Sequence, residues 1–367
     1  MKLLFITLEQ SARENLKSIL KNKFFLSNYN KIYTYGMNKD LPIFKDITGV
    51  KIKSIMGISN VIYNFKYLLK LRRNLFEIIN KNDFTHVFFV DSFDFTKFFL
   101  NKYKSKKINY CQIIGPSVFI WRKNKANFIN NEMNKLFSIF HIEKKYYKKN
   151  IYSYIGHPIL HNICKNKILI KKVSNIGFFL GSRSQEIEKN IHVVKDLIYL
   201  LSNYKEYNYH FFITEEFKKN IKNKLSHFKN IKFYLNDDKY YKNISKLDFA
   251  FACSGTVHLE LSFSNIPHYI FYKASSFNYF IFKFFVKSKY LSLINIFTKK
   301  LIVKEFVQKD FNSLNIFNHF KLLTSDINNL QNYQKNIKKS LKETNFSSLN
   351  SRPIVDYLKT FSLAIKD

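Results

Sequence analysis

With 367 residues, 46% of them hydrophobic, the chain can bury two sizeable cores, and this length predicts two or three domains. Its three cysteines, Cys111, Cys164 and Cys253, lie far apart and exclude a zinc-ligand spacing and a disulfide framework, and no apolar run approaches the roughly 18 to 20 residues that span a bilayer. The 61 Lys and Arg residues against 26 Asp and Glu give a net charge of +35, which predicts attraction to an acidic surface, either anionic lipid or nucleic acid.

Strands and helices are predicted to alternate along the first half of the chain. The start, Leu3-Leu4-Phe5-Ile6, is typical of a strand rather than of a secretory signal, which favours a reducing cytoplasm. In chain order the pattern predicts a strand at 2–8, a helix at 12–21, a strand at 31–35, a helix at 61–79 and strands at 87–90 and 109–114, before a less regular stretch at 130–140.

The second half repeats the scheme, with a helix after each strand. Strands are predicted near residues 176–180, 209–213, 231–234, 249–252 and 269–271. Such alternation predicts an α/β protein with parallel sheets in two Rossmann-like, doubly wound domains. Because charge is dense between His157 and Lys172, we place the boundary there and expect domains at 1–165 and 166–325. Residues 326–367 are expected to form a helical tail that packs back on the fold or on a partner subunit.

The first chemical signal follows the apolar strand Phe178-Phe179-Leu180, where Gly181 and Ser182 lead directly into a helix opened by polar residues. Backbone N–H groups and the positive end of a helix favour an anion there, and Arg183 adds a forked cationic donor. The segment therefore predicts a diphosphate-binding turn. Many turns with Gly-Ser bind nothing, and that alternative stays open at this point.

A second turn of the same kind follows the apolar run at 249–252. Ser254-Gly255-Thr256 leads into a predicted helix, and Glu260 lies about one turn inside it. At that depth the carboxylate is still near the strand ends, where it can bind a sugar hydroxyl. Two such turns in one half of the chain indicate a nucleotide-sugar site.

Short motifs run in order through most of the chain. They are Met56-Gly57, Asp91-Ser92-Phe93-Asp94-Phe95, Gly115-Pro116-Ser117 with Trp121-Arg122, Gly156-His157-Pro158, Gly181-Ser182-Arg183 with Glu186-Ile187, Ser254-Gly255-Thr256 with Glu260, Tyr272-Lys273, Ser292-Leu293-Ile294-Asn295 and Glu305-Phe306-Val307-Gln308. In this order they resemble the lipid-A-disaccharide synthase family of inverting glycosyltransferases. The resemblance implies two domains facing a cleft, the GT-B type. It also implies transfer of 2,3-diacylglucosamine from UDP to 2,3-diacylglucosamine 1-phosphate, which forms a β-1,6 disaccharide and UDP.

The chain departs from the family pattern in three places. Leu8–Glu14 stands where the family usually has Gly-Glu-x-Ser-Gly-Asp, so the turn glycine and the acid are displaced. Asp91–Thr96 keeps both carboxylates of Asp-x-Pro-Asp-Phe-Asn but lacks the proline and the asparagine, and Ser59 and Asn60 lie where an acid usually follows Met-Gly. These departures mark a diverged member and affect the acceptor side most.

Asp91 and Asp94 directly follow the predicted strand at 87–90, at the end of a parallel strand where ligands bind. Inverting glycosyl transfer needs one carboxylate to take the proton of the attacking hydroxyl while the nucleotide diphosphate leaves from the opposite face of the sugar. We assign Asp94 as this base and give Asp91 a supporting role. The alternative, that one acid caps a helix and the other is a surface charge, stays open.

The resemblance implies the remaining site residues. The donor set, for the UDP-sugar, is Gly181, Ser182, Arg183, Ser254, Gly255, Thr256, Glu260, Asn295 and Gln308. The acceptor or cleft set is Ser11, Ser117, Arg122 and His157, and a hinge role for His157 is an equal alternative. No metal or other cofactor is expected, because Arg183 and helix N-termini can stabilise the leaving diphosphate, and Asp237-Asp238 is typical of a turn and cap.

Two segments combine apolar and basic residues as an interfacial helix does, residues 61–79 and the aromatic stretch 277–291, although each also suits an ordinary packed helix. The chain is rich in Lys, Asn and Ile and has only 8 Gly and 5 Pro. This composition is expected when a genome rich in A and T biases the codons, and such a bias would account for part of the positive charge. The acylated substrates that the resemblance implies favour a membrane over nucleic acid. We therefore expect peripheral association with the inner face of a bacterial inner membrane, and a homodimer with exchanged C-terminal segments is implied by the family pattern.

Two competing interpretations remain. One is another UDP-sugar protein of the same fold, such as the transferase of peptidoglycan synthesis or a UDP-N-acetylglucosamine 2-epimerase. Those enzymes carry glycine-rich loops and acid or histidine sets that this chain lacks. The other is a non-catalytic lipid- or nucleic-acid-binding descendant, which the altered first loop and the charge would allow. Retention of Asp91, Asp94, Arg183 and Glu260 favours the enzyme.

Overall fold

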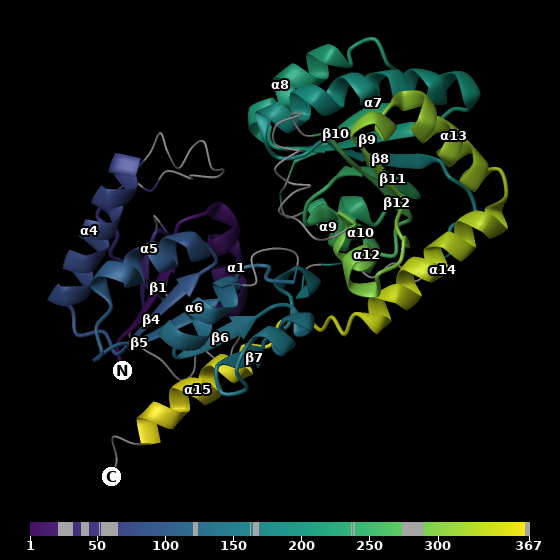
Figure 1. The fold of residues 1–367 in the computed structure, drawn as a ribbon. Coiled ribbons are helices and arrows are strands. Elements are labelled where there is room, and N and C mark those ends of the chain that lie inside the picture. Colours follow the sequence, from purple (N-terminus) through teal and green to yellow (C-terminus); the bar gives the residue numbers. More distant parts are fainter. Residues whose placement is uncertain are drawn as a thin grey trace. The chain divides into compact units, whose positions relative to one another are not determined.

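A computed structural model describes residues 1–20, 32–37, 44–50, 52, 65–119, 124–161, 163, 169–235, 237, 239–273 and 289–363. The chain divides into two compact units, each with its own parallel sheet (Figure 1). Unit 1 comprises Met1–His161 and Phe346–Asp367, and unit 2 comprises Asn162–Asn345. The predicted tail at 326–367 is thus divided between them.

Unit 1 is built on a seven-stranded sheet with the order β3-β2-β1-β4-β5-β6-β7, and all of its strand pairs are parallel. The strands are β1 Leu3–Thr7, β2 Ile32–Tyr35, β3 Lys45–Asp46, β4 His86–Val90, β5 Asn109–Ile113, β6 Lys135–Ser138 and β7 Tyr152–Tyr154. The helices are α1 Gln10–Leu20, α4 Phe65–Lys81, α5 Phe93–Tyr103, α6 Asn124–Glu132, the 3-10 helices η1 His141–Tyr146 and η2 Pro158–His161, and α15 Arg352–Leu363. β1 and β4 are buried at every residue, because parallel strands are covered on both faces.

The two faces of this sheet are covered by different parts of the chain. Helices α4, α5 and α6 bury Leu75, Phe99 and Ile129 against one face. On the other face the ring of Tyr357 in α15 packs edge-on against His86 of β4 and Phe137 of β6. The C-terminal segment therefore completes the core of unit 1.

Unit 2 has a six-stranded parallel sheet with the order β10-β9-β8-β11-β12-β13. The strands are β8 Asn175–Phe179, β9 Asn208–Ile213, β10 Ile231–Leu235, β11 Phe249–Cys253, β12 His268–Tyr272 and β13 Glu305–Val307. The helices are α7 Ser184–Tyr204, α8 Glu215–Lys224, α9 Tyr240–Ile244, α10 Val257–Phe263, α12 Leu293–Thr298, the 3-10 helix η3 Gln308–Asp310, α13 Ser313–Thr324 and α14 Ile327–Glu343. Figure 1 shows α7, α8 and α13 on one side of this sheet and α9, α10 and α12 on the other. The core includes stacked phenylalanines, with Phe178 lying 5.0 Å from Phe211 and 5.4 Å from Phe251 between ring centroids.

The predicted strands and the doubly wound α/β class are confirmed, with element ends shifted by one or two residues in most cases. The irregular stretch at 130–140 contains the end of α6 and then β6. Of the predicted interfacial segments at 61–79 and 277–291, residues 61–64 and 277–288 lie outside the described residues. Within the described ranges, no helix is long and apolar enough to cross a bilayer.

Candidate active site

The two predicted anion turns lie side by side in unit 2. Their strands, β8 and β11, are neighbours, with Phe179 paired to Ala252. Gly181 has a left-handed backbone with φ +105°, and a Cβ on it would lie 3.5 Å from the Cys253 sulfur and 2.7 Å from Oε2 of Glu186. Only glycine combines that backbone with that crowding at low cost. The pairing of β8 with β11 therefore brings the turns at 181–183 and 254–256 together at the carboxyl end of one sheet.

The first turn is already filled by a carboxylate of the chain itself. Oε2 of Glu186 accepts from the Ser182 N–H at 3.3 Å, and Oε1 accepts from the Arg183 guanidinium at 3.0 Å. Glu186 is the third residue of α7, where a glutamate commonly reaches back to the N-terminal N–H groups of a helix. Although it is paired with Glu186, the Arg183 side chain is 60% exposed. Glu186 thus binds the donors that a diphosphate would use.

The second turn, at residues 254–256, is held in place by His258, which is buried in α10. Its Nδ1–H donates to the carbonyl oxygen of Gly255, and its Nε2 accepts from the Leu293 N–H at 3.0 Å. These bonds assign the tautomer and connect the turn to the start of α12. Sequence analysis missed this residue, although a histidine two residues after Ser-Gly-Thr was the available signal.

Glu260 lies in α10, where the Tyr240 hydroxyl donates to its Oε2 at 2.8 Å. Burial raises the pKa of Glu260 to about 7, and the bond from Tyr240 opposes this rise. At neutral pH the carboxyl is therefore divided between an acceptor form and a protonated form. A sugar hydroxyl that donates to it would bind better above this pKa.

Asn295 is completely buried at the start of α12. Its Oδ1 accepts from the Ile302 and Val303 N–H groups, and its Nδ2 donates to the Val303 carbonyl and to Oε1 of Glu305. The Glu305 carboxylate in turn accepts from the backbone N–H groups of Leu291 and Ser292. The amide of Asn295 is thus used within unit 2, where it holds the segment after α12 directly and the loop before α12 through Glu305. Gln308, the other predicted donor residue after Glu260, follows β13 with a left-handed φ of 55°.

In unit 1, two consecutive non-glycine residues adopt left-handed backbones directly after β4, Asp91 with φ 58° and Ser92 with φ 46°. Such residues are uncommon, and two in succession need support from their surroundings. The Asp91 N–H donates to the Ile113 carbonyl at 2.8 Å, and Nε2 of the buried Gln112 donates to the Asp91 carbonyl at 2.8 Å. The turn is therefore fixed by the neighbouring strand β5.

The two acids at this turn differ in their surroundings. Burial raises the pKa of Asp91, and the Ser92 N–H, which donates to its Oδ1 at 2.9 Å, opposes that rise. Asp94, in the first turn of α5, has a side chain that is 75% exposed and paired with Lys125 of α6. Asp94 is thus the carboxylate that a substrate can reach, while Asp91 belongs to the framework of the turn.

The altered first loop contacts the same turn. Oε1 of Glu9 accepts from the Ser92 hydroxyl at 3.3 Å, across 83 residues of sequence. Arg13 donates from Nε to the Gly36 carbonyl at 2.6 Å. An acid displaced along the sequence therefore still lies beside Asp91, which the motif comparison alone did not reveal.

The predicted acceptor residues that the structure describes lie on three different segments of unit 1. Ser11 is exposed on α1, Ser117 is half-buried in the loop after β5, and Arg122 lies outside the described residues. His157 is 6% exposed, its backbone N–H donates to the Ser347 carbonyl at 2.9 Å, and its Nδ1 accepts from the Ile159 N–H at 3.2 Å. Burial lowers the pKa of His157 to about 4, so it is neutral at physiological pH. It connects the body of unit 1 to the returning C-terminal segment.

In the part of the chain that the structure describes, no group of three or more His, Cys, Asp or Glu residues could hold a metal ion. Oδ1 of Asp237 accepts from the Lys239 N–H at 2.9 Å just before α9, as a turn residue does. Its neighbour Asp238 lies outside the described residues.

Two parallel, doubly wound sheets, one in each unit, define the GT-B class of two-domain folds. Solved structures with this fold include MnaA of S. aureus with UDP (TM-score 0.62, 12% identity, covering 100% of this chain and 98% of that one). They also include the UDP-GlcNAc 2-epimerase from Neisseria meningitidis bound to UDP-GlcNAc (TM-score 0.59, 14% identity, covering 98% and 100%). MurG of Acinetobacter baumannii has a TM-score of 0.58 at 8% identity, covering 98% and 100%. At these identities the likeness shows the fold.

The sequence defines the family. The model of the lipid-A-disaccharide synthetase family matches residues 3–356. A lipid-A-disaccharide synthase of Campylobacter jejuni (strain RM1221) is 28% identical over 93% of this chain and 99% of its own length. One of Helicobacter pylori (strain Shi470) is 30% identical over 68% of each chain. The chain belongs to the lipid-A-disaccharide synthetase family.

It is a glycosyltransferase that uses a UDP-sugar and acts in lipid A biosynthesis. The predicted family and enzyme class are thereby confirmed. The family match does not favour the epimerase, the peptidoglycan transferase or the non-catalytic descendant.

Proposed function

We propose that the chain transfers 2,3-diacylglucosamine from UDP to 2,3-diacylglucosamine 1-phosphate and releases UDP and a β-1,6-linked disaccharide. The observation that carries the proposal is the pairing of β8 with β11, which brings two anion-binding turns and Arg183 together in unit 2. Relatives named lipid-A-disaccharide synthase along nearly the whole chain support the choice of substrates.

In this mechanism the Asp94 carboxylate takes the proton of the acceptor hydroxyl. At the same time the oxygen of that hydroxyl bonds to the anomeric carbon of the donor sugar. The bond from that carbon to the diphosphate breaks on the opposite face, so the configuration inverts. Asp94 is suited to this step because it is exposed, and its Lys125 partner can stay with it during the transfer. Asp91 supports the step by fixing the turn that precedes α5.

The leaving diphosphate takes over the donors that Glu186 holds, the Ser182 N–H and the Arg183 guanidinium. The exposed backbone of Gly255 and Thr256 and the half-buried Ser254 supply the second turn, and Glu260 accepts from a hydroxyl of the donor. Asn295 and Gln308 act as positioning residues, Asn295 through the loop that His258 connects to this turn. The mechanism uses protein donors alone for the leaving group.

Acylated substrates place the reaction at a membrane surface, and α4 offers a face for peripheral contact. Its apolar residues Leu71, Leu75 and Ile79 are buried, whereas Phe65 is 49% exposed beside the exposed Lys66 and Lys70. Apolar and cationic residues together suit an anionic lipid surface. We therefore propose association with the inner face of the bacterial inner membrane, and a homodimer in which Phe346–Leu363 would be the exchanged segment.

The test mixes purified protein with UDP-2,3-diacylglucosamine and 2,3-diacylglucosamine 1-phosphate in detergent and follows disaccharide and UDP by mass spectrometry. UDP-N-acetylglucosamine replaces the donor in a parallel reaction, and we expect product only with the acylated donor. Product from the unacylated sugar would contradict the proposed donor. If the protein binds UDP but forms no disaccharide, the proposed donor is kept and the proposed acceptor is refuted. If it neither binds UDP nor forms disaccharide, the proposal of a transferase is refuted in favour of a binding protein.

A further inference from the structure

Arg13 brings a cation to the carboxyl end of the unit 1 sheet. It lies in the first turn of α1, the helix that follows β1, and its Nε donates to the carbonyl oxygen of Gly36 at 2.6 Å. Gly36 directly follows β2, which pairs with β1 on the side opposite to β4. Because the carboxyl ends of parallel strands meet at one edge, the guanidinium lies at the same edge of the sheet as the turn that carries Asp94.

The start of α1 connects Arg13 to that turn. The Arg13 N–H donates to the Glu9 carbonyl at 3.1 Å, so the two residues are one helical turn apart. Oε1 of Glu9 accepts from the Ser92 hydroxyl, and Asp94 follows two residues later in the first turn of α5. β1 and β4 are paired along their whole length. Arg13 and the proposed base thus belong to segments that leave neighbouring strands and contact each other.

The end of the Arg13 guanidinium is unused. Nη2 is enclosed by the protein and has no hydrogen-bond partner. Within the described ranges Nη1 makes no hydrogen bond either, and on this half-buried side chain it is reached by solvent. A buried donor on a charged group is costly when it has no acceptor, which indicates that an acceptor binds there. Because both nitrogens are bonded to one carbon, an anion that bonds to Nη1 has a second oxygen beside Nη2.

The positive charge of Arg13 is not offset by a nearby carboxylate. Among the residues that the structure describes, Arg13 forms no ion pair. Its neighbour Glu14 pairs instead with Lys17 at 2.9 Å, and the Glu9 carboxylate accepts from Ser92. The family pattern in this stretch, Gly-Glu-x-Ser-Gly-Asp, has two acids and no fixed cation. The arginine is therefore a feature of this chain.

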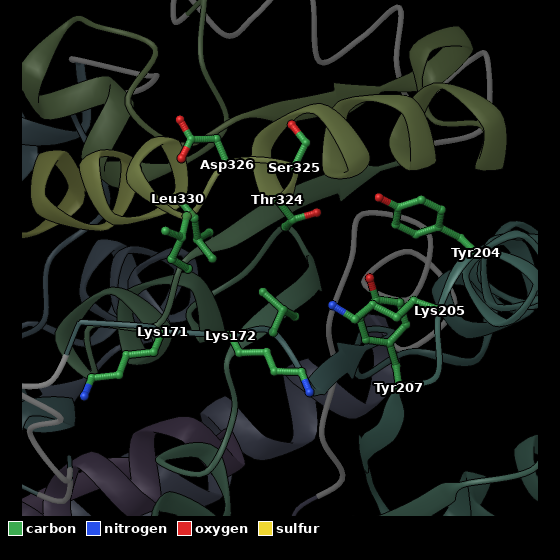
Figure 2. Close-up of a pocket in the computed structure, with 11 residues that line it drawn as sticks. Lys171, Lys172, Tyr204, Lys205, Tyr207, Thr324, Ser325, Asp326 and Leu330 are labelled. Carbon is green, nitrogen blue, oxygen red and sulfur yellow. The ribbon is translucent and has the colours of Figure 1, made fainter.

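Exposed lysines elsewhere do not show this combination. Figure 2 shows Lys171, Lys172 and Lys205 at a hollow that precedes the strands of unit 2. All three are exposed to solvent. Arg13 differs from them because it is half-buried, is bonded along one edge to Gly36 and has one nitrogen enclosed without an acceptor.

We propose that Arg13 binds the phosphate of the acceptor, so that the enzyme selects 2,3-diacylglucosamine 1-phosphate over the same sugar without a phosphate. The inference rests on the proposed function, in which the acceptor hydroxyl lies beside Asp94. A phosphate monoester matches the fork of a guanidinium and carries the charge that Arg13 lacks. The bond from Nε to Gly36 is kept, and it fixes the orientation of the fork.

Two acceptors separate recognition of the phosphate from any other role of Arg13: 2,3-diacylglucosamine 1-phosphate, and the methyl glycoside of 2,3-diacylglucosamine, which has no phosphate. Arg13→Gln should lower kcat/KM for the phosphorylated acceptor by about 10- to 100-fold, because hydrogen bonds to a charged group are lost. With the glycoside, Arg13→Gln and the wild type should agree within about twofold, since neither can make the interaction. Equal losses with both acceptors would assign Arg13 to the framework of the turn and overturn the proposal. A wild type that uses both acceptors equally well would overturn it too.

Two further variants separate Arg13 from the general charge of the protein. Lys17→Gln removes a charge from the same helix, one turn further on, and should change the preference for the phosphorylated acceptor by less than about twofold. Arg13→Lys keeps the charge but loses the fork, so it should retain part of the preference. If Lys17→Gln reduces the preference as much as Arg13→Gln does, the proposal is refuted.

Calorimetry with 2,3-diacylglucosamine 1-phosphate in detergent, in the presence of UDP, measures acceptor binding without turnover. Arg13→Gln should weaken this binding by about 10- to 100-fold. If the wild type binds the acceptor through Arg13 but forms no disaccharide, the proposed function is refuted and this inference is kept. If disaccharide forms and both proteins bind the acceptor equally, the proposed function is kept and this inference is refuted. Absence of acceptor binding by the wild type would refute both.

Discussion

In unit 1 the turn after β4 is made of two left-handed non-glycine residues held by Gln112, whereas in unit 2 the turn after β8 depends on Gly181. At the first turn the accessible carboxylate, Asp94, points outward. At the second, the Glu186 carboxylate binds the donors of the turn itself. The comparison teaches that the proposed base, Asp94, is already exposed to solvent, whereas the proposed diphosphate donors, the Ser182 N–H and the Arg183 guanidinium, are held by Glu186.

The largest effect is expected at the unit 1 turn. Asp94→Asn should lower kcat by about 10²- to 10⁴-fold because it removes the base, while leaving the Kd for UDP unchanged. Disaccharide formation and UDP calorimetry measure the two quantities separately. Glu77→Gln, an exposed acid on α4 paired with Arg73, is the control and should keep full activity. Retention of more than a third of kcat in Asp94→Asn would assign the base elsewhere.

The next effect belongs to the unit 2 turn. Arg183→Gln should weaken UDP binding by about 10- to 100-fold, since a hydrogen bond to a charged group contributes about 1.5 to 3 kcal/mol. Uridine, which lacks the diphosphate, should bind this variant and the wild type alike in calorimetry. Lys195→Gln, a change at an exposed lysine of α7, serves as control. Equal loss for uridine and UDP would mean that Arg183 does not act on the diphosphate.

The assignment of Glu260 to the donor site predicts that donor binding depends on pH. Its pKa is raised to about 7 by burial, so the carboxylate form that accepts from a hydroxyl is lost as the pH falls through that value. UDP-sugar affinity should therefore fall by up to about tenfold between pH 8 and pH 6. Glu260→Gln should bind weakly with a flat profile. A wild-type profile that is itself flat in this range would remove Glu260 from the donor site.

The smallest effect tests the difference between the turns directly. Glu186→Gln should raise UDP affinity about threefold, because the amide competes less well than a carboxylate for the Arg183 guanidinium and the Ser182 N–H. Glu188→Gln is the matched control, because Glu188 also lies on α7, two residues further along, and pairs with Lys224 instead of Arg183. If Glu186→Gln weakens UDP binding, then Glu186 supports the bound turn and does not compete with the ligand.

Much of this architecture was predictable because buried parallel strands are continuous apolar runs. β4 and β11 stand out as His-Val-Phe-Phe-Val and Phe-Ala-Phe-Ala-Cys, and the residues after them mark the ends where ligands bind. The adjacency of the turns after β8 and β11 follows from strand order, which local sequence does not contain.

What could not be predicted depends on neighbours distant in the chain. Gln112 belongs to β5, and only the pairing of β4 with β5 shows that it holds the Asp91 carbonyl, although a glutamine inside an apolar strand was a signal. The different exposure of Asp91 and Asp94 likewise follows from where the backbone turns. Asn295 was selected through the resemblance, and its burial depends on Val303 and Glu305, which β13 and the preceding loop supply.

Unit 1 is interrupted in the sequence by the whole of unit 2, since residues 162–345 come between its two parts. During synthesis the complete sheet of unit 2 leaves the ribosome before the segment that closes unit 1. Until Phe346–Leu363 arrives, the Ile155 carbonyl lacks the Asn350 N–H, and the rings of His86 and Phe137 lack Tyr357. Unit 1 is therefore begun before unit 2 and completed after it, and a released chain truncated near residue 345 would carry the whole of unit 2 beside a unit 1 that lacks its closing segment.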